Sequence, residues 1–238
     1  MTVFWLQRVI GADGRERWSE HARGSILDVN DGIATAAGIA EGFGTAGAST
    51  ATLLLAGAAV MLAGGLAAAG ARYSEERTEW EMNRSLLEAE RASIAADPQA
   101  EFEELVGIYE TKGLSADLAR QVAEALTQQD PVAAHADAEL NLPSAPSSRA
   151  SMVAALTAGL SFALGAAVPL AVVSAVPVGP RIELTFVAVL LALALTGWFT
   201  SWLTGLSLLR LVRRNLVLGA TTMAAGLIIG LVSGVKSQ

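Results

Sequence analysis

Three carboxylates occur in the first apolar stretch of the sequence, where an ionisable group is costly and is therefore a functional candidate. Asp28 and Asp31 are three residues apart, so a helix places them on one face. Asp31 is either a cation ligand or proton carrier, or part of a structural ion-pair cluster with Asp28 and Arg72, which we expect at a similar depth. Glu41 is expected roughly 20 Å further out, where it either lines an exit path or lies among headgroups.

A second group of candidate ligands lies in the polar middle of the chain. Its members are Glu101, Glu104, His135, Glu139, Glu88 and Glu90. The first two are three residues apart on one predicted helix, and the imidazole is four residues from Glu139 on another. Carboxylates and an imidazole from neighbouring helices suit Fe, Mn, Co or Zn, and the last two could complete the set. Alternatively, such pairs arise by chance on acidic surface helices.

Known catalytic arrangements are missing from the sequence. There is no H-E-x-x-H, no P-loop, no nucleophile elbow and no cysteine, and the second histidine, His21, is isolated. The net charge of −7 excludes a basic nucleic-acid surface. We therefore expect no enzyme, no nucleic-acid partner and no permanently bound cofactor, with divalent metal ions (Fe²⁺, Mn²⁺, Zn²⁺ or Co²⁺) as substrate or ligand.

The composition indicates a membrane protein with a soluble insert. Hydrophobic residues make up 53% of the 238 residues, charged residues only 16%, and the mean hydropathy is +0.46. Of the 23 acidic residues, 16 lie between Tyr73 and Asn141, against five basic residues. Met1 to Arg23 has no apolar core of signal-peptide type, so we expect no cleaved targeting segment.

The long apolar stretch from Gly32 to Ala71 predicts two membrane helices, because one crossing needs only about 20 residues. Residues 44–49 predict the turn between a helix over 25–43 and a helix over 50–72. No glycine or proline interrupts Tyr73 to Ala96, so the second helix is expected to continue as a rod.

Punctuation residues predict the remaining helices. Asp97-Pro98 opens a helix that Gly113 ends, Ser115 opens a helix over 116–129, and Asp130-Pro131 opens one that closes near Asn141. Residues 142–148 form a linker. Three more membrane helices are predicted, over 152–178, 184–209 and 216–235.

The predicted fold is therefore all-α, a polytopic membrane protein with five transmembrane helices and a cytosolic helical insert. Its parts are an N-terminal segment (1–24), helices one and two (25–72), the acidic insert (73–148) and helices three to five (149–238). Basic residues set the orientation. Those at the ends of the helices are Arg72, Arg77, Arg149, Arg210, Arg213 and Arg214. They share one side if the N-terminus and insert are cytosolic and the C-terminus is outside; Arg181 and Lys236 disagree. A prokaryotic cytoplasmic membrane is the expected location.

Small residues recur at helix-packing spacing in two helices. Gly226, Gly230 and Gly234 form a double G-x-x-x-G, and Gly38 with Gly42 forms a single one. Either one of these faces is a subunit interface, or the spacing reflects the ordinary abundance of small residues in membrane helices.

The sequence also resembles a known family. Asn30-Asp31-Gly32-Ile33 resembles the N-D-G-I/L signature of the vacuolar iron transporter (VIT) family. The further matches, in chain order, are 63–66 with Tyr73, Asp97-Pro98, 101–105, 108–109, 113–114, 118–123, His135 with Asp137 and Glu139, 162–165 and 169–170. The resemblance covers about Arg23 to the C-terminus.

The resemblance implies a homodimer of five-helix subunits that exports ferrous iron, and sometimes manganese, from the cytosol in exchange for protons. It implies that Asp31 is the membrane metal or proton carboxylate. It also implies cytosolic ligands at Glu101, Glu104 and Glu139, with His135 where some relatives have methionine.

The sequence departs from the family pattern at the membrane site. The segment S-M-A-x-G-E-Y reads Ala67 to Tyr73 here, so Ala68 replaces a methionine and Arg72 an acidic residue. Asp28 stands where the family has glycine. A cation at Arg72 repels a passing Fe²⁺, and pairing with Asp28 would restore the local charge but not the ligand set.

We therefore predict a dimeric exporter of divalent metal, working by proton antiport, with a diverged membrane site. One alternative is a transporter of a different cargo, such as a chelated metal or an organic compound. Another is a non-transporting membrane protein whose insert binds metal or docks a partner.

Overall fold

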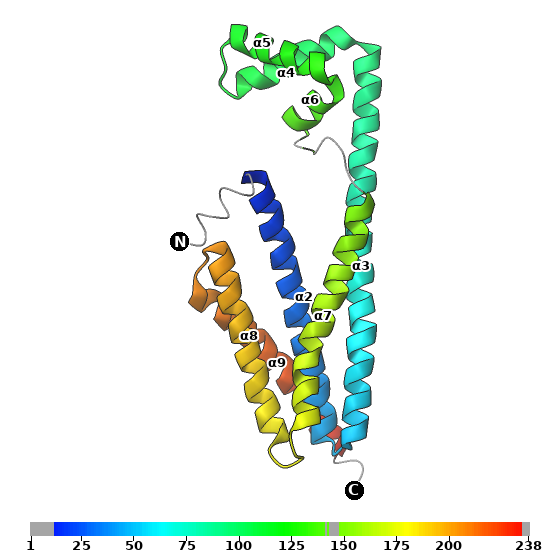
Figure 1. Ribbon diagram of the computed structural model, residues 1–238, viewed down its shortest axis with the longest axis vertical. Helices are drawn as coiled ribbons and strands as arrows, with labels where there is room; N and C mark the ends of the chain where they lie inside the picture. Colours follow the sequence, from blue (N-terminus) through cyan, green and yellow to red (C-terminus); the bar gives the residue numbers. More distant parts are fainter. Residues whose placement is uncertain (1–11, 141, 143–147, 235–238) are drawn as a thin grey trace. The chain divides into compact units, whose positions relative to one another are not determined.

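A computed structural model describes residues 12–140, 142 and 148–234 of the chain, and these residues form eight α-helices and no strand (Figure 1). In chain order the helices are α2 (Ala12–Thr45), α3 (Thr50–Ala96), α4 (Pro98–Thr111), α5 (Ala116–Gln129), α6 (Pro131–Ala138), α7 (Ser148–Ala175), α8 (Arg181–Thr204) and α9 (Leu208–Gly234). The predicted all-helical fold is confirmed.

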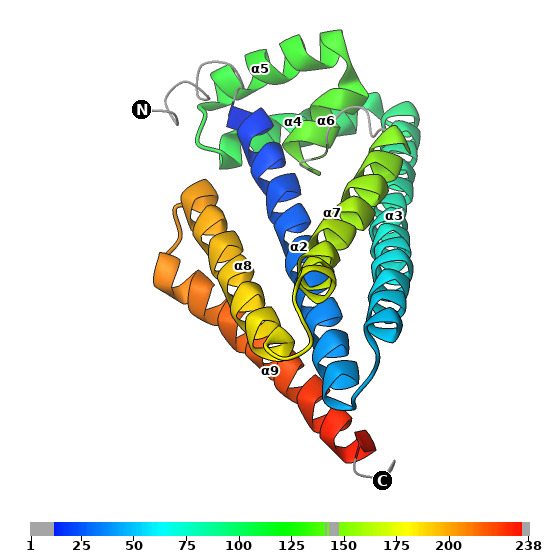
Figure 2. The same cartoon turned by 60° about the horizontal axis from the view of Figure 1, so that its bottom comes forward.

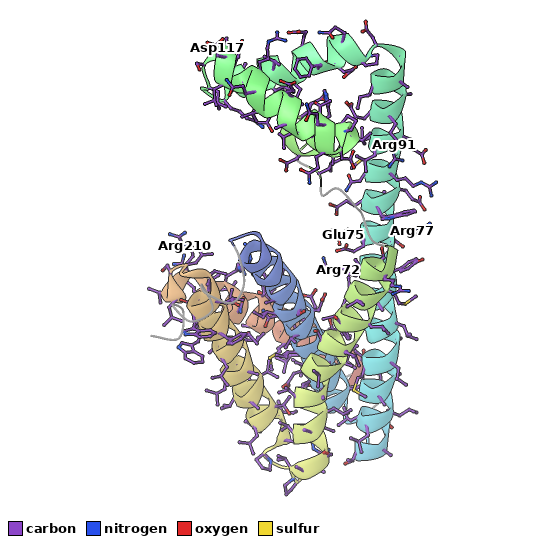
Figure 3. The ribbon with its side chains drawn as sticks, turned by 45° about the horizontal axis from the view of Figure 1, so that its top comes forward. Arg72, Glu75, Arg77, Arg91, Asp117 and Arg210 are labelled. Carbon is purple, nitrogen blue, oxygen red and sulfur yellow. The ribbon has the colours of Figure 1, made fainter. Side chains whose placement is uncertain are left out.

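The helices divide between two compact units. The apolar unit comprises Met1–Tyr73 and Val153–Gln238, and the insert unit comprises Ser74–Met152. Helix α3 runs through both, because no residue after its apolar half breaks the helix; the predicted continuous rod is confirmed. Its second half carries a run of charged side chains that includes Arg72, Glu75 and Arg77 (Figure 3).

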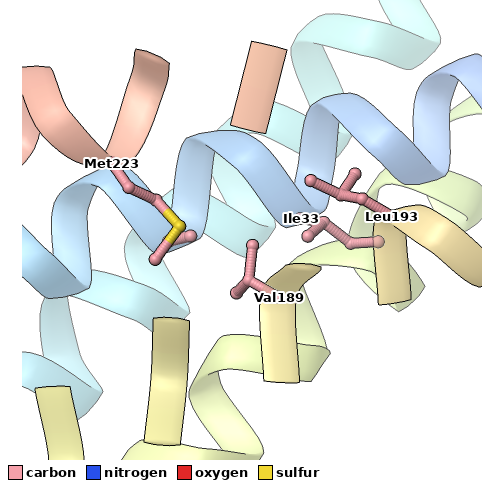
Figure 4. Close-up of a cluster of buried hydrophobic side chains, with 5 residues drawn as sticks. Ile33, Val189, Leu193 and Met223 are labelled. Carbon is pink, nitrogen blue, oxygen red and sulfur yellow. The ribbon is translucent and has the colours of Figure 1, made fainter. Parts of the chain in front are cut away.

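Helix α2 is the central helix of the apolar unit, and it packs against both α8 and α9 (Figure 2). The three helices share a cluster of buried side chains (Figure 4). Its members are Ile33, Ala37, Val189, Leu193 and Met223, each no more than 1% exposed. We refer to these five residues as the apolar layer.

A second cluster joins α7 to α2 and α3. Phe162 and Ala166 of α7 are buried with Ala36 of α2, and Val60 and Met61 of α3 pack against them. Backbones approach closely here: a Cβ added at Gly32 would collide with the Phe162 carbonyl. The signature glycine is thus required by packing.

The two glycine stripes face each other within one chain. A side chain at Gly226 would collide with the Gly38 carbonyl, and one at Gly230 with the Gly42 carbonyl. Absence of side chains lets the α2 and α9 backbones meet. The interpretation of these faces as a subunit interface is therefore wrong for both: they are used inside the subunit.

Four helices are long and apolar enough to cross a membrane, namely α3, α7, α8 and α9. Helix α2, the first predicted span, is not among them, and its apolar stretch is interrupted by Asp28, Asp31 and Glu41. Four apolar helices are confirmed, and a fifth crossing by α2 stays a prediction.

Several predicted boundaries shift. Helix α2 already begins at Ala12, before the predicted residue 25. Helix α6 ends at Ala138, before the predicted end near Asn141. Asn141 and most of the linker predicted over 142–148 lie outside the described residues. Gly205, whose φ is +69°, ends α8 at Thr204, before the predicted residue 209. Helix α9 begins at Leu208, before the predicted residue 216, because no glycine or proline lies between Leu208 and Leu216. The three arginines predicted to lie between these helices (Arg210, Arg213 and Arg214) are therefore in the first turns of α9.

Candidate metal centre and membrane ion pair

Two capped helices position the candidate ligands of the insert unit. Asp97 accepts a hydrogen bond from the Ala100 backbone N–H (3.0 Å), and Asp130 accepts one from the Ala133 N–H (3.0 Å). Proline occupies the first turn in both α4 and α6. Each Asp-Pro pair thus fixes where its helix starts, as predicted, and so fixes the register of the ligands that follow.

A small apolar core holds α4, α5 and α6 together. Leu105 and Val106 of α4 are buried against Ala119 and Ala123 of α5 and Ala134 of α6. The three helices contact one another. His135 follows Ala134 directly and is only 2% exposed, so its imidazole is held inside the unit rather than at its surface.

Carboxylates from three helices converge on this buried imidazole. His135 Nδ1 lies 3.1 Å from Glu90 Oε1 of α3, 3.9 Å from Glu101 Oε2 of α4 and 4.0 Å from Glu139 Oε2 at the end of α6. Single ligand atoms of Glu90, His135 and Glu139 all lie within 4.8 Å of one another. The structure thus brings together four of the six candidate ligands, and their binding of a metal stays a prediction.

Two of the converging atoms are buried and make no hydrogen bond, and their nearest polar contact is each other, at 3.1 Å, an ion pair when the imidazole is protonated. They are Glu90 Oε1 and His135 Nδ1. Burial raises the pKa of Glu90. The nearby His135 lowers this pKa, and the negative charges of three neighbouring carboxylates raise it further, those of Glu139, Glu101 and Glu104. Buried polar atoms without partners are unfavourable, and a divalent cation bound between them would satisfy both and neutralise the carboxylates. Oxygen and imidazole ligands suit Fe²⁺, Mn²⁺, Co²⁺ or Zn²⁺.

Two candidates are not brought into this centre. Glu88 is exposed and pairs with Arg84 (2.9 Å). It lies two residues before Glu90 on α3, so the two side chains point to nearly opposite sides of the helix. The proposed part of Glu88 in the ligand set is wrong. Glu104 is exposed as well, and it acts on Glu90 only through its charge.

In the apolar unit, the predicted pair between Arg72 and Asp28 is present. Arg72 Nη2 lies 3.9 Å from Asp28 Oδ2, and the two side chains are 30% and 16% exposed. A Cβ at Gly24 would meet the same guanidinium at 3.2 Å. The arginine therefore lies along the α2 backbone, where its charge compensates that of the aspartate.

The other two acidic residues of α2 differ sharply in exposure. Asp31 is exposed on the surface of the described chain, whereas Glu41 is 3% exposed. The Glu41 side chain is thus covered by the apolar unit, and its predicted position, on an exit path or at the depth of the headgroups, stays a prediction.

Sequence reasoning missed a partly buried polar network beside the signature. Thr196 Oγ1 of α8 donates to Asn30 Oδ1 of α2 (2.6 Å), and Asn215 Nδ2 of α9 donates to Thr196 Oγ1 (3.3 Å) and to the Leu193 carbonyl (3.3 Å). Polar residues in otherwise apolar helices were the available signal. The network ties the helix turn that carries Asp31 to α8 and α9.

Comparisons with known proteins place the sequence in a family. The VIT family model matches residues 22–231. A vacuolar iron transporter of Acanthamoeba castellanii (strain ATCC 30010 / Neff) is 32% identical over 120 residues. That alignment covers 50% of this chain and 43% of the relative, so the chain spans less than half of the length of the curated relative that it matches.

Proposed function

Since this chain belongs to the VIT family, as a multi-pass membrane transporter of metal, we propose that it exports divalent metal from the cytosol by proton antiport. Fe²⁺ is the first candidate for the transported ion and Mn²⁺ the second. The relative's name as a vacuolar iron transporter supports iron as the cargo.

The observation that carries this proposal is the convergence of buried ligand atoms at the insert centre: Glu90 Oε1 and His135 Nδ1 lie 3.1 Å apart, and carboxylate oxygens of Glu101 and Glu139 lie within 4.0 Å of the same nitrogen. A soluble helical unit has no structural need to bury a carboxylate and an imidazole unsatisfied, since apolar residues would be at least as stable there. Four ligands of mixed oxygen and nitrogen type bind Fe²⁺ and Mn²⁺ without demanding one metal only.

We infer that five helices cross the membrane: α2, the apolar half of α3, α7, α8 and α9. Packing of α2 against α8 and α9 supports its inclusion, because a helix in the middle of an apolar bundle shares the bundle's surroundings. Arginines at the ends of the helices favour a cytosolic N-terminus and insert unit, with the C-terminus outside. Insert-bound metal would thus be collected from the cytosol.

A homodimer would complete the route through the membrane. Asp31 is exposed in the single chain and follows the anchored Asn30 directly. Exposed carboxylates are costly against lipid, so a second subunit that covers this face would give Asp31 a polar route along which metal or protons move.

The ion pair Arg72–Asp28 favours one rival. An arginine beside the expected route repels Fe²⁺, and Asp28 offsets that charge but leaves Ala68 in place of a thioether ligand. The rival is a membrane protein that binds metal in its insert unit without moving it.

Proteoliposome flux separates the two functions. Purified protein is reconstituted, and uptake of Fe²⁺, Mn²⁺ and Co²⁺ is followed beside metal affinity in detergent. The proposal predicts saturable uptake of Fe²⁺ that Asp31→Asn abolishes without loss of metal affinity. Affinity without flux would replace the transporter by the binder.

A further inference from the structure

The three-helix contact of α2, α8 and α9 contains polar groups on both sides of the apolar layer. Towards one end lies the Asn30–Thr196–Asn215 network. Towards the other end, one and two turns beyond Ala37 on α2, lie Glu41 and Thr45. Along α2 the apolar layer, drawn in Figure 4, lies between Asn30 and Glu41.

Glu41 is the more unusual of these groups. Glu41 is only 3% exposed, and its Oε1 atom has no hydrogen-bond partner. Thr45 Oγ1, one turn further on, is also buried and without a partner. On α9 the nearby face is made of glycine: a Cβ at Gly230 would meet Thr45 Cβ at 2.9 Å.

The charged groups near Glu41 do not neutralise it. Glu183 of α8 is exposed and repels the Glu41 carboxylate. Arg181 of the same helix is buried, but its guanidinium donates to the Val176 carbonyl (3.1 and 2.9 Å) and to Thr50 Oγ1 (3.0 Å). Among the described residues, no basic side chain forms an ion pair with Glu41.

A carboxylate in such a place is unstable as an anion. Burial without a counter-charge costs several kcal/mol, and the group takes up a proton or a cation instead. Glu183 adds repulsion in the same direction. Glu183 is exposed at the start of α8, and in the other direction along α2 the buried side chains of the apolar layer begin one turn away, at Ala37.

We propose that Glu41 is a proton-exchange site that opens only to the side of the membrane at which α8 begins. The step is a simple transfer: a hydronium ion gives its proton to the Glu41 carboxylate, leaving water and a carboxylic acid, and the reverse step returns the proton. Coupling of this exchange to metal movement rests on the proposed function; the proton site itself does not.

Infrared spectroscopy of the reconstituted protein tests the site without any metal. Wild-type protein at neutral pH should show a carboxylic-acid C=O band that moves in D₂O and disappears reversibly in alkaline buffer. Glu41→Gln should lose that band, and the matched control Glu183→Gln, exposed on the next helix, should keep it. Retention of the band in Glu41→Gln, or a band that neither exchanges nor titrates, would overturn the proposal.

A conservative variant covers the case in which Glu41→Gln does not fold. Glu41→Asp keeps a carboxyl group, so its band should move in frequency, and an unmoved band would assign the signal to another residue. The infrared result does not depend on transport. A titrating Glu41 band without Fe²⁺ flux would contradict only the proposed function. Fe²⁺ flux without the band would contradict only the proton site.

Discussion

The Arg72 guanidinium lies 3.9 Å from the Asp28 carboxylate, and this ion pair joins the apolar half of α3 to α2. The two residues are opposite in charge, and both are less than one third exposed. The pair therefore works as a unit: the arginine is tolerated because the aspartate is present. Asp31, three residues further along α2, is exposed in the described chain.

We expect the two members of this pair to be coupled in stability. Arg72→Ala should destabilise the protein because it leaves Asp28 and Asp31 as excess negative charge, and Asp28→Asn should destabilise it too. The double variant should lose less than the sum, with a coupling energy of about 0.5–3 kcal/mol. Thermal melts of the four proteins measure it. The exposed pair Arg77–Glu81 (2.8 Å) is the control and should couple by no more than about 0.5 kcal/mol; equal coupling in both pairs would argue against a special role for Arg72.

Metal affinity of the insert unit should depend on Glu90 and His135. Each contributes a buried ligand atom to the centre, so Glu90→Gln and His135→Ala should each weaken Mn²⁺ binding by more than roughly tenfold, since even outer-shell changes reach that range. Calorimetry in detergent measures the affinity. Glu88→Gln is the matched control, two residues away on the same helix but paired with Arg84, and it should bind like the wild type. A loss in Glu88→Gln as large as in Glu90→Gln would contradict the ligand assignment.

The stability of the metal-free protein should depend on pH through Glu90. Because burial and neighbouring carboxylates raise its pKa, the folded state holds this proton more tightly than the unfolded state does. Stability is then greatest below the unfolded-state pKa and is lost as the pH rises through the raised value. Melting temperatures across pH should show this fall, Mn²⁺ should reverse it, and Glu90→Gln should flatten it. A fall of the same size in Glu90→Gln would assign the effect to other groups.

Side chains should not be tolerated where α2 meets α9. Gly230→Leu would collide with the Gly42 carbonyl, and overpacking of this kind costs typically about 1–3 kcal/mol or more. We expect aggregation and a lower melting temperature in detergent. Gly70→Ala, on a face of α3 with open space, is the control and should melt no lower than the wild type. A stable, monodisperse Gly230→Leu protein would mean that these two helices are not in backbone contact.

Local features of the sequence were sufficient to predict most of the helices. Asp-Pro pairs and Gly113, whose φ is +99°, set the bounds of α4 and the start of α6, because their backbone preferences act within one turn. The ion pair of Arg72 with Asp28 was predictable too, because an unpaired charge within a membrane is costly and an opposite charge at the same depth lowers that cost. Spacing in the sequence also singled out Glu101 on α4 and His135 on α6, which lie close together in the structure.

The remaining features depend on how distant helices are rotated against one another. Glu88 and Glu90 look equivalent in the sequence, and only the rotation of α3 against α4 and α6 selects Glu90. The network of Asn30, Thr196 and Asn215 needs three helices in one register, which no local pattern encodes. Pairing of the glycine stripes within one chain, instead of between subunits, has the same origin.

The metal centre can be tested most directly by locating the ion. Crystals soaked in Mn²⁺, with diffraction data collected where manganese scatters anomalously, would place the metal by its own signal. We predict an anomalous peak from a manganese ion bound by His135 Nδ1 and Glu90, with Glu139 or Glu101 as a further ligand. Peaks elsewhere in the chain, with His135 and Glu90 unliganded, would contradict the assignment of this centre as the site that collects the transported metal.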